Sequence, residues 1–479
     1  MVRSESSGLF LFFRKEGRKG CTVTHLQDLM DSFLYKPFFY RQEMRNVVHF
    51  KLIITINFLN FLTVIIYLIY TELVKRRFAM YSIRNINEDV VYVGVEDRRL
   101  HLFENIFPLD RGVTYNSYVI RDEKTALLDT ADATVGQQFF ENVAKALDGR
   151  SLDYLIVNHM EPDHCALIAE ALSKHPEATV VGNAKTFQMI EQFFALSIPE
   201  ERKKVVKEGD VLSLGKHQLR FVMAPMVHWP EVMFSFDETD GILFSADAFG
   251  VFGTNNGNIF ADELNYQAQD FVDDARRYYT NIVGKYGMQV QNVLKKAAGL
   301  KIRMLCPLHG PIWRENLDFI LGLYDKWSRY EAEEKAVAVF YNSIYGNTES
   351  VINAFTMKLA ERGVHNIKAY DVSKTDVSVM IAECFRVTNL VFGATTYNNG
   401  LFPKMENLVA DMKALNVQNK KISIIENGSW APTAGKLLKA EFETLKNCEL
   451  LGETLTVKSA AFSVDALDAL ADTVAASLR

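Results

Sequence analysis

Short apolar runs bounded by turn-forming residues recur through the middle of the chain. Apolar and polar positions alternate over short stretches in residues 118–128, 205–225 and 232–246, and the segment Asp-Glu-Thr-Asp-Gly at 237–241 interrupts the last of them. Such alternation is typical of strands that bury one face and are separated by turns. The pattern predicts two sheets packed against each other with helices outside them.

The last third of the chain has a different pattern, in which strands alternate with helices. Residues 336–341, 389–394 and 421–425 are apolar runs of strand length, whereas 349–362 and 464–478 place apolar residues at helical spacing. A short apolar run indicates a buried strand, and the longer amphipathic stretches indicate helices that cover a sheet. Regular strand–helix alternation predicts a doubly wound parallel sheet.

The length of the chain, 479 residues, exceeds what one hydrophobic core supports and predicts two or three domains. We place the two-sheet sandwich in residues 80–333 and the doubly wound sheet in residues 334–479, with a charged helical connector over about 315–334. The expected fold class is therefore α/β and α+β. An αββα sandwich comes first, and a doubly wound parallel sheet follows it.

The first 79 residues belong to neither domain. They carry 12 Lys and Arg against 6 Asp and Glu, a net charge of +6, which leaves −12 for the remainder of a chain whose total is −6. Residues 52–70 form an uncharged apolar run of 19 residues, long enough to span a membrane, although Asn57 and Asn60 interrupt it. We favour a mis-assigned start, with the true start at Met80. A membrane anchor at 52–70 is the alternative.

Four side chains that bind metals fall within six positions in the segment His159-Met-Glu161-Pro-Asp163-His164. This segment directly follows the apolar run 154–157, so it is expected at the end of a strand. Pro162 argues against a regular helix across it and favours a loop. Nitrogen and carboxylate ligands suit iron, zinc or manganese.

Three more residues of this kind, His228, Asp247 and His309, each lie at the end of an apolar stretch. Seven ligands are too many for one tetrahedral zinc but fit two metals that share a carboxylate. Asp247 stands between two groups of three and is the natural bridge. The other six histidines have no such setting, and we interpret them as surface or core residues: His25, His49, His101, His175, His217 and His365.

A loop rich in small polar residues joins the strand at 336–341 to the helix at 349–362. A strand, such a loop and a helix make a phosphate cradle, because backbone N–H groups and the positive end of the helix face the anion. The loop is neither a Walker loop nor a Gly-x-Gly-x-x-Gly dinucleotide motif. It comprises Ser343, Ile344, Tyr345, Gly346, Asn347 and Thr348.

Two further loops follow the strands at 389–394 and 421–425. In doubly wound sheets, ligands bind outside the carboxyl ends of the strands, which is where these loops are expected. Each loop has one aromatic residue, and Tyr397 and Trp430 are candidates to flank a flat ring. The predicted binding residues are Thr395, Thr396, Tyr397, Asn398, Asn399 and Gly400 in one loop, and Asn427, Gly428, Ser429 and Trp430 in the other.

Together these motifs resemble the flavodiiron proteins, which join a metallo-β-lactamase-like domain to a flavodoxin-like domain. The pattern His-x-Glu-x-Asp-His is followed by His228 after 64 positions, Asp247 after 19 more and His309 after 62 more. The resemblance implies one iron held by His159, Glu161 and His228, the other by Asp163, His164 and His309, and Asp247 as the bridge. No catalytic residue beyond these ligands is assigned.

Glu161 distinguishes two kinds of chemistry within this fold. Zinc hydrolases of the fold carry a histidine at this position of the motif. A carboxylate there adds negative charge, which favours redox-active iron and stabilises its oxidised state. The glutamate therefore favours electron transfer over hydrolysis.

The same resemblance implies FMN and two iron ions as cofactors, with the three loops of the second domain around the FMN. It implies reduction of dioxygen to water, of nitric oxide to nitrous oxide, or of both. Electrons would come from a separate donor, a rubredoxin-like protein or a reduced deazaflavin. It also implies a head-to-tail homodimer or a dimer of such dimers, which would place the FMN of one subunit beside the irons of the other.

Charge and cysteine content narrow the remaining classes. The acidic balance of the two domains argues against nucleic acid as a partner. The five cysteines form no Cys-x-x-Cys pair, which excludes a rubredoxin-type site and favours a reducing cytoplasm over a disulfide framework. Two other functions stay open: a metallo-hydrolase regulated by the flavodoxin-like domain, and a redox or nitric oxide sensor without turnover.

Overall fold

The computed structural model describes residues 80–479 together with Leu62, Thr63 and Ile65. The chain divides into two compact units at Met80, and the unit 80–479 is the one described below. The apolar run at 52–70, the alternative membrane anchor, lies outside the described residues except for these three positions. No helix within the described residues is long and apolar enough to cross a membrane.

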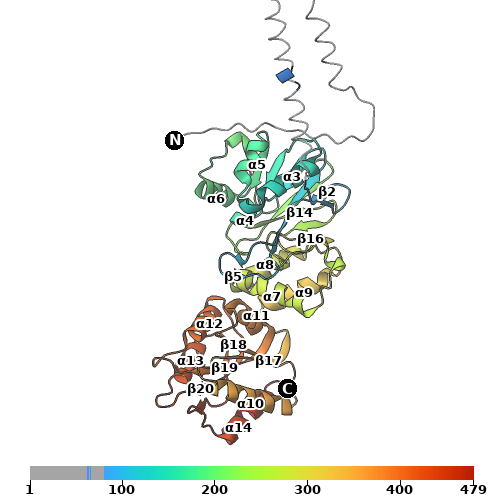
Figure 1. Cartoon of the computed structure of the whole chain (residues 1–479). Coiled ribbons are helices and arrows are strands. Elements are labelled where there is room, and N and C mark those ends of the chain that lie inside the picture. Colours follow the sequence, from blue (N-terminus) through green and yellow to red (C-terminus); the bar gives the residue numbers. More distant parts are fainter. Residues whose placement is uncertain (1–61, 64, 66–79) are drawn as a thin grey trace, which may run out of the picture. The chain divides into compact units, whose positions relative to one another are not determined.

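Two sheets form the first half of this unit (Figure 1). The seven-stranded sheet runs in the order β1-β2-β7-β8-β9-β10-β11, with parallel pairing from β8 to β11. Its strands are β1 (Arg84–Asn85), β2 (Val90–Tyr92), β7 (Tyr118–Arg121), β8 (Thr125–Leu128), β9 (Tyr154–Ile156), β10 (Thr179–Gly182) and β11 (Lys203–Val205). The five-stranded sheet contains, in order, β12 (Val211–Ser213), β13 (Gln218–Met223), β14 (Met233–Asp237), β15 (Ile242–Phe244) and β16 (Met304–Cys306).

Side chains from both sheets meet in a shared core. In β7, Tyr118 and Ile120 point into this core, whereas Val119 points to the outer core under the helices, as the two-residue period of a strand requires. Phe221 and Phe244 enter the same inner core from the five-stranded sheet. The alternating pattern therefore positions both sheets, and the expected sandwich is confirmed.

Helices cover the outer faces of the two sheets, and two small two-stranded sheets lie beside them in the sequence. The α-helices are α3 (Gly136–Leu147), α4 (Pro162–Cys165), α5 (Ile168–Lys174), α6 (Ala184–Phe194), α7 (Gln269–Tyr278), α8 (Gly287–Ala297) and α9 (Leu317–Ser328). The π-helical segment η4 (Tyr279–Val283) continues α7 directly. Two small sheets pair β3 (Val95–Asp97) with β6 (Val113–Tyr115), and β4 (Leu102–Phe103) with β5 (Phe107–Pro108).

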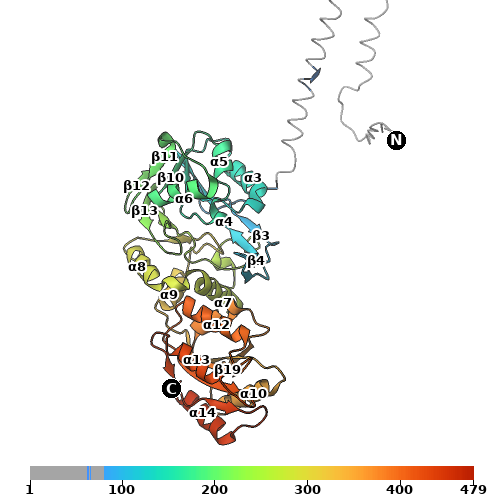
Figure 2. The same cartoon turned by 90° about the vertical axis from the view of Figure 1, so that its left-hand side faces the viewer.

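The second half is a parallel sheet in the order β18-β17-β19-β20-β21, with β22 also paired to β20. Helices α10 and α14 pack together on one face, as both views show, and α11 to α13 contribute to the core on the other (Figures 1 and 2). This is the expected doubly wound sheet. Its elements are β17 (Glu334–Tyr341), α10 (Asn347–Glu361), β18 (Lys368–Asp371), α11 (Val377–Arg386), β19 (Val387–Thr395), α12 (Pro403–Ala414), β20 (Lys421–Asn427), α13 (Ala434–Phe442), β21 (Glu449–Leu450), β22 (Leu455–Val457) and α14 (Val464–Ala476).

Helix α7 and the segment η4 contact α11 of the second half. Arg277 on α7 donates hydrogen bonds to the Ser378 hydroxyl at 2.8 Å and to the Pro108 carbonyl at 2.7 Å. Arg276 donates to Glu333, just before β17, at 2.7 Å. These contacts fix the region between the two halves, whereas the exact domain boundary at 333/334 stays a prediction.

Candidate functional site

All seven predicted metal ligands come together at one edge of the sandwich, where strands from both sheets end. His159 and Glu161 follow β9, and Asp247 and His309 follow β15 and β16. His228 lies in the connection between β13 and β14. Because these strands end at the same edge, residues up to 150 positions apart in the sequence meet there.

The expectation of a loop across the motif was wrong in one respect. Pro162 begins the short helix α4 rather than interrupting it, with Glu161 in extended conformation just before it. Proline is favoured at the first helical position, because that residue has no intrahelical partner for an N–H group. The single turn then presents Asp163 and His164 on one side of the site.

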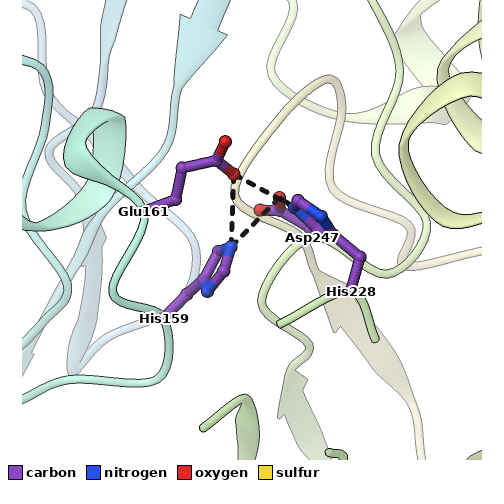
Figure 3. Close-up of side chains that lie close together, drawn as sticks. All are labelled: His159, Glu161, His228 and Asp247. Carbon is purple, nitrogen blue, oxygen red and sulfur yellow. Dashed lines mark hydrogen bonds and ion pairs between the residues drawn. The ribbon is translucent and has the colours of Figure 1, made fainter. Parts of the chain in front are cut away.

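One group of ligand atoms comprises His159, Glu161, His228 and Asp247, and they lie within 4.8 Å of one another (Figure 3). The Oε2 atom of Glu161 lies 3.3 Å from Nε2 of His159 and 3.0 Å from Nε2 of His228. The Oδ2 atom of Asp247 lies 3.6 Å and 3.3 Å from the same two nitrogens.

The second group comprises Asp163, His164 and His309. The Oδ2 atom of Asp163 lies 3.4 Å from Nε2 of His164 and 3.3 Å from Nε2 of His309. Oδ1 of Asp247, the oxygen not used by the first group, lies 3.2 Å from Nε2 of His164. The two oxygens of Asp247 therefore face the two groups separately, as a bridging carboxylate requires.

The electrostatics of the cluster favour cations. Burial disfavours the charged form of His159 and would lower its pKa. The carboxylates of Asp247, Glu161 and Glu231 outweigh this effect and raise the pKa of His159 well above its ordinary value. For Asp247, burial is likewise outweighed by His159 and His164, which hold the pKa well below its ordinary value. Both carboxylate oxygens of Asp163 and of Asp247 are buried and lack hydrogen-bond partners. Buried acceptors in that state fit metal ions.

Glu231 lies behind the first group and was not predicted from the sequence. Its side chain is fully buried, and Oε1 accepts hydrogen bonds from Nδ1 of His159 at 2.9 Å and from the backbone N–H of Met160 at 2.8 Å. A bond of this kind fixes the imidazole so that Nε2 faces the metal. The Thr114 carbonyl accepts in the same way from Nδ1 of His309 at 2.6 Å. No sequence motif marks either partner.

Two other residues near the cluster also escaped the sequence analysis. Glu104 is exposed in the turn between β4 and β5, and desolvation beside the cluster together with the neighbouring carboxylate of Glu161 raises its pKa to about 8. The ring of Tyr278 is fully buried 5.5 Å from that of His309, and its hydroxyl has no hydrogen-bond partner. A single acidic residue in a loop, or a single aromatic residue in a helix, belongs to no sequence motif that would mark it as part of a metal site.

His217 lies outside this cluster but does not have an ordinary core environment. Its ring is fully buried, with Nδ1 2.9 Å from Asp237 and Nε2 3.1 Å from Asp89. Burial alone would lower the pKa of His217, but these two hydrogen bonds raise it to about 9. Because both ring nitrogens face carboxylates and the ring is protonated near neutral pH, neither nitrogen offers a lone pair to a metal. The residue is a charged link between Asp89, ahead of β2, and Asp237 of β14.

The three predicted loops of the second half surround a cavity of 410 Å³. The loop before α10 contributes Ser343, Ile344, Tyr345, Asn347 and Thr348, and the loop after β19 contributes Thr395, Thr396, Asn398 and Asn399. Asn427, Gly428, Ser429 and Trp430 come from the third loop. Three predicted residues, Gly346, Tyr397 and Gly400, do not line the cavity, whereas Ala431 and Ser459 line it without having been predicted.

The cavity fits a phosphate-bearing flavin. Its lining residues are all uncharged, so the groups that face an anion are hydroxyls, amides and the N-terminus of α10. Gly346 precedes that helix at φ +89°, a conformation that glycine adopts without strain. The hydroxyls of Thr348 and Thr395 lie 3.1 Å apart, which ties the first loop to the second. Tyr345 and Trp430 are 91% and 92% exposed at the rim, where a flat ring could stack.

The arrangement defines a class: a metallo-β-lactamase-like sandwich with a two-metal cluster, followed by a flavodoxin-like sheet with a flavin cavity. The model of the ODP family of β-lactamases matches residues 113–310. The chain is 31% identical over 351 residues to the anaerobic nitric oxide reductase flavorubredoxins of Salmonella arizonae and Escherichia coli, covering 72% of this chain and 72% of each relative.

Solved structures agree with this class. The rubredoxin oxygen:oxidoreductase of Desulfovibrio gigas superposes with a TM-score of 0.77 at 25% identity, covering 83% of this chain and 98% of that one. The flavodiiron protein of Giardia intestinalis shares the fold, with a TM-score of 0.74 at 23% identity over 83% and 97% of the two chains. The chain belongs to the flavodiiron proteins. It is an oxidoreductase whose cofactors are FMN and two iron ions.

Proposed function

We propose that this chain reduces dioxygen to water, nitric oxide to nitrous oxide, or both, at two irons held by the seven-residue cluster. His159, Glu161 and His228 would hold one iron, Asp163, His164 and His309 the other, and Asp247 would bridge them. The division of the Asp247 oxygens between the two groups is the observation that supports this assignment most directly. The names of similar proteins, a nitric oxide reductase and an oxygen oxidoreductase, support the two substrates.

When bound, FMN and the two irons supply electrons, up to the four that one dioxygen needs. The protein contributes position and surroundings. Glu231 and the Thr114 carbonyl orient His159 and His309, and the full burial of His159, His164, His309 and Asp247 excludes bulk water. The cavity between the loops after β17, β19 and β20 would hold the FMN, with its phosphate at the start of α10.

We also propose that a separate protein of the rubredoxin type, or a reduced deazaflavin, delivers electrons to the FMN. The names of relatives that join flavin and rubredoxin chemistry support the first donor. A head-to-tail homodimer would cover the exposed rim residues Tyr345 and Trp430 and bring the flavin near a partner's irons. Cys165, Cys306 and Cys384, buried and unpaired, are consistent with a reducing cytoplasm as the location.

One anaerobic experiment tests the proposal. Iron, zinc and FMN are measured per purified chain, the protein is reduced, and the consumption of dioxygen and of nitric oxide is followed separately. We expect about two irons and one FMN with turnover of at least one gas. Zinc in place of iron, together with thioester or lactam cleavage, would instead identify a hydrolase. Iron and FMN without gas consumption would identify a sensor.

A further inference from the structure

Three fully buried aromatic residues, Tyr279, Tyr324 and Trp327, form a contiguous cluster behind the candidate metal site. The ring centroids are 4.9 Å apart for Tyr279 and Tyr324, 5.3 Å for Tyr279 and Trp327, and 5.7 Å for Tyr324 and Trp327. All three contacts fall within the range of direct aromatic packing. The proposed function assigns no role to this cluster.

The cluster connects to the metal site through two neighbours. Tyr278 precedes Tyr279 at the junction of α7 and η4, and its ring lies 5.5 Å from that of His309. Tyr324 packs 4.6 Å from the ring of Phe249, two residues after Asp247. The π-helical segment allows Tyr278 and Tyr279 to be buried in succession, one beside the metal site and one in the cluster.

The hydroxyls of these tyrosines differ in their surroundings. All three are buried, and that of Tyr278 has no partner, whereas Ser328 lies close to the hydroxyl of Tyr279 and the backbone N–H groups of Phe249 and Gly250 lie close to that of Tyr324. A buried hydroxyl without a partner costs free energy, whereas phenylalanine would fill the same space without that cost. Packing alone therefore does not account for tyrosine at position 278, beside the metal site.

Trp327, at the far end of the cluster, has a proton acceptor. Its indole Nε1–H donates to Oε1 of Glu333 at 2.6 Å, and Arg276 donates to both oxygens of the same carboxylate, to Oε2 at 2.7 Å. Loss of an electron makes an indole N–H strongly acidic, so an adjacent carboxylate assists that oxidation. Trp313, the other fully buried tryptophan, has no partner for its N–H.

We propose that Trp327, with Glu333, is an internal one-electron reserve that Tyr324 and Tyr279 couple to the metal site. This inference rests on the proposed function, because it takes dioxygen as the oxidant. One electron leaves the Trp327 indole, and its Nε1 proton passes to Glu333. The electron passes through Tyr324 or Tyr279 to the metal site, where it is the last of the four electrons that convert dioxygen to water when the flavin and the irons have supplied only three. One electron from the external donor and the proton on Glu333 then restore the indole.

The test uses the full chain loaded with iron and FMN, with ring-deuterated tryptophan in one sample. The protein is reduced with fewer electrons than one dioxygen needs, mixed with dioxygen and frozen for electron paramagnetic resonance. We expect an organic radical whose hyperfine pattern changes with the deuterated label. Trp327→Phe should remove the signal, and Glu333→Gln should reduce it at least tenfold, whereas Trp313→Phe should leave it unchanged.

Tyr324→Phe provides a second variant that keeps the ring and its packing, and we expect it to reduce the tryptophan radical severalfold. Melting temperature and iron content are measured for every variant, so that unfolding is recognised. Normal dioxygen consumption without a tryptophan radical, or a radical that survives Trp327→Phe, would overturn the reserve and leave the proposed function intact. Absence of both iron and dioxygen consumption would overturn the proposed function and the reserve with it.

Discussion

Asp247 is the residue on which the two-metal arrangement depends, because each of its oxygens faces a different group of ligands. In Asp247→Asn one oxygen becomes an NH₂ group, which cannot ligate a cation, and a negative charge is lost. We expect the iron content to fall from about two per chain to one or fewer. Asp262→Asn, which alters a carboxylate paired with Arg314, should retain both irons in the same metal analysis. Two tightly held irons in Asp247→Asn would contradict the bridging role.

We expect Glu231 to support metal binding by positioning His159 through a hydrogen bond rather than through its negative charge. Glu231→Ala leaves the Nδ1–H of His159 and the backbone N–H of Met160 unpaired in a buried place. Partners of metal-bound histidines typically contribute about 10–100-fold to metal affinity, so we expect iron loss to a chelator at correspondingly lower concentration. Glu231→Gln keeps an oxygen that accepts both bonds and should lose much less. Equal iron retention in the alanine variant and the wild type would refute the positioning role.

Some residues of the site could be predicted from the sequence, and others could not. The proximity of the seven proposed ligands was predictable because each follows an apolar strand, and strand ends of one sandwich share an edge. Glu231 and the Thr114 carbonyl act through contacts with residues 72 and 195 positions away, and nothing local in the sequence marks them. Tyr397 was expected beside the flavin because it is aromatic and in the right loop. It does not line the cavity, and its ring lies 6.0 Å from that of Phe402, so its contact with the flavin stays a prediction.

At the scale of elements, His217 links two parts of the sandwich through charge. His217 pairs with Asp89, which precedes β2, and with Asp237 at the end of β14. Asp240 lies in the turn after β14, and Lys216 also pairs with Asp89. The pKa of His217 in the folded state, about 9, exceeds its ordinary value of 6.5. The link therefore contributes its full share to the free energy of unfolding below pH 6.5. Its contribution is lost as the pH rises through about 9.

His217→Gln therefore has a stability cost that depends on pH. We expect the free energy of unfolding to fall by about 3 kcal/mol near pH 6, as when one partner of a buried ion pair is removed. The difference from the wild type should shrink above pH 9. Urea unfolding at several pH values measures this, with the exposed His365→Gln as the control. A difference that stays constant between pH 6 and pH 10 would show that the charge of His217 is unimportant.

One element differs from what its residues predicted, and another was not predicted, each for a physical reason. Pro162 was read as a helix breaker, although proline also begins helices, and only the conformation of Glu161 decides between the two roles. The π-helical segment after α7 has no sequence signature, because the extra residue is accommodated by packing against α9 and α11. Strands and long helices, in contrast, followed their apolar spacing closely.

At the scale of the molecule, the metal cluster and the flavin cavity lie in separate halves, so one should be removable without the other. Ser343→Asp places a negative charge in the predicted phosphate cradle, where no lining residue is cationic. Like-charge contact in a binding site costs several kcal/mol, so we expect FMN affinity to fall by about 100-fold. Iron content should not change.

Ser463→Asp is the matched control for that variant. Ser463 caps α14 in the same half of the molecule, and aspartate is an equally good capping residue. Flavin fluorescence on titration with FMN gives the affinity of both variants. If Ser463→Asp lost FMN as strongly as Ser343→Asp, the effect would lie in the stability of the sheet and not in the cradle.

The neutral lining of the flavin cavity also determines how the protein responds to its surroundings. Attraction between a phosphate and lysine or arginine weakens as dissolved salt screens it. Oriented hydroxyls, amides and backbone N–H groups act at contact distance, where mobile ions have no room to intervene. We therefore expect this cavity to hold FMN with less dependence on ionic strength than a cavity with lysine or arginine at the phosphate, so that the supply of electrons depends less on the salt content of the cell.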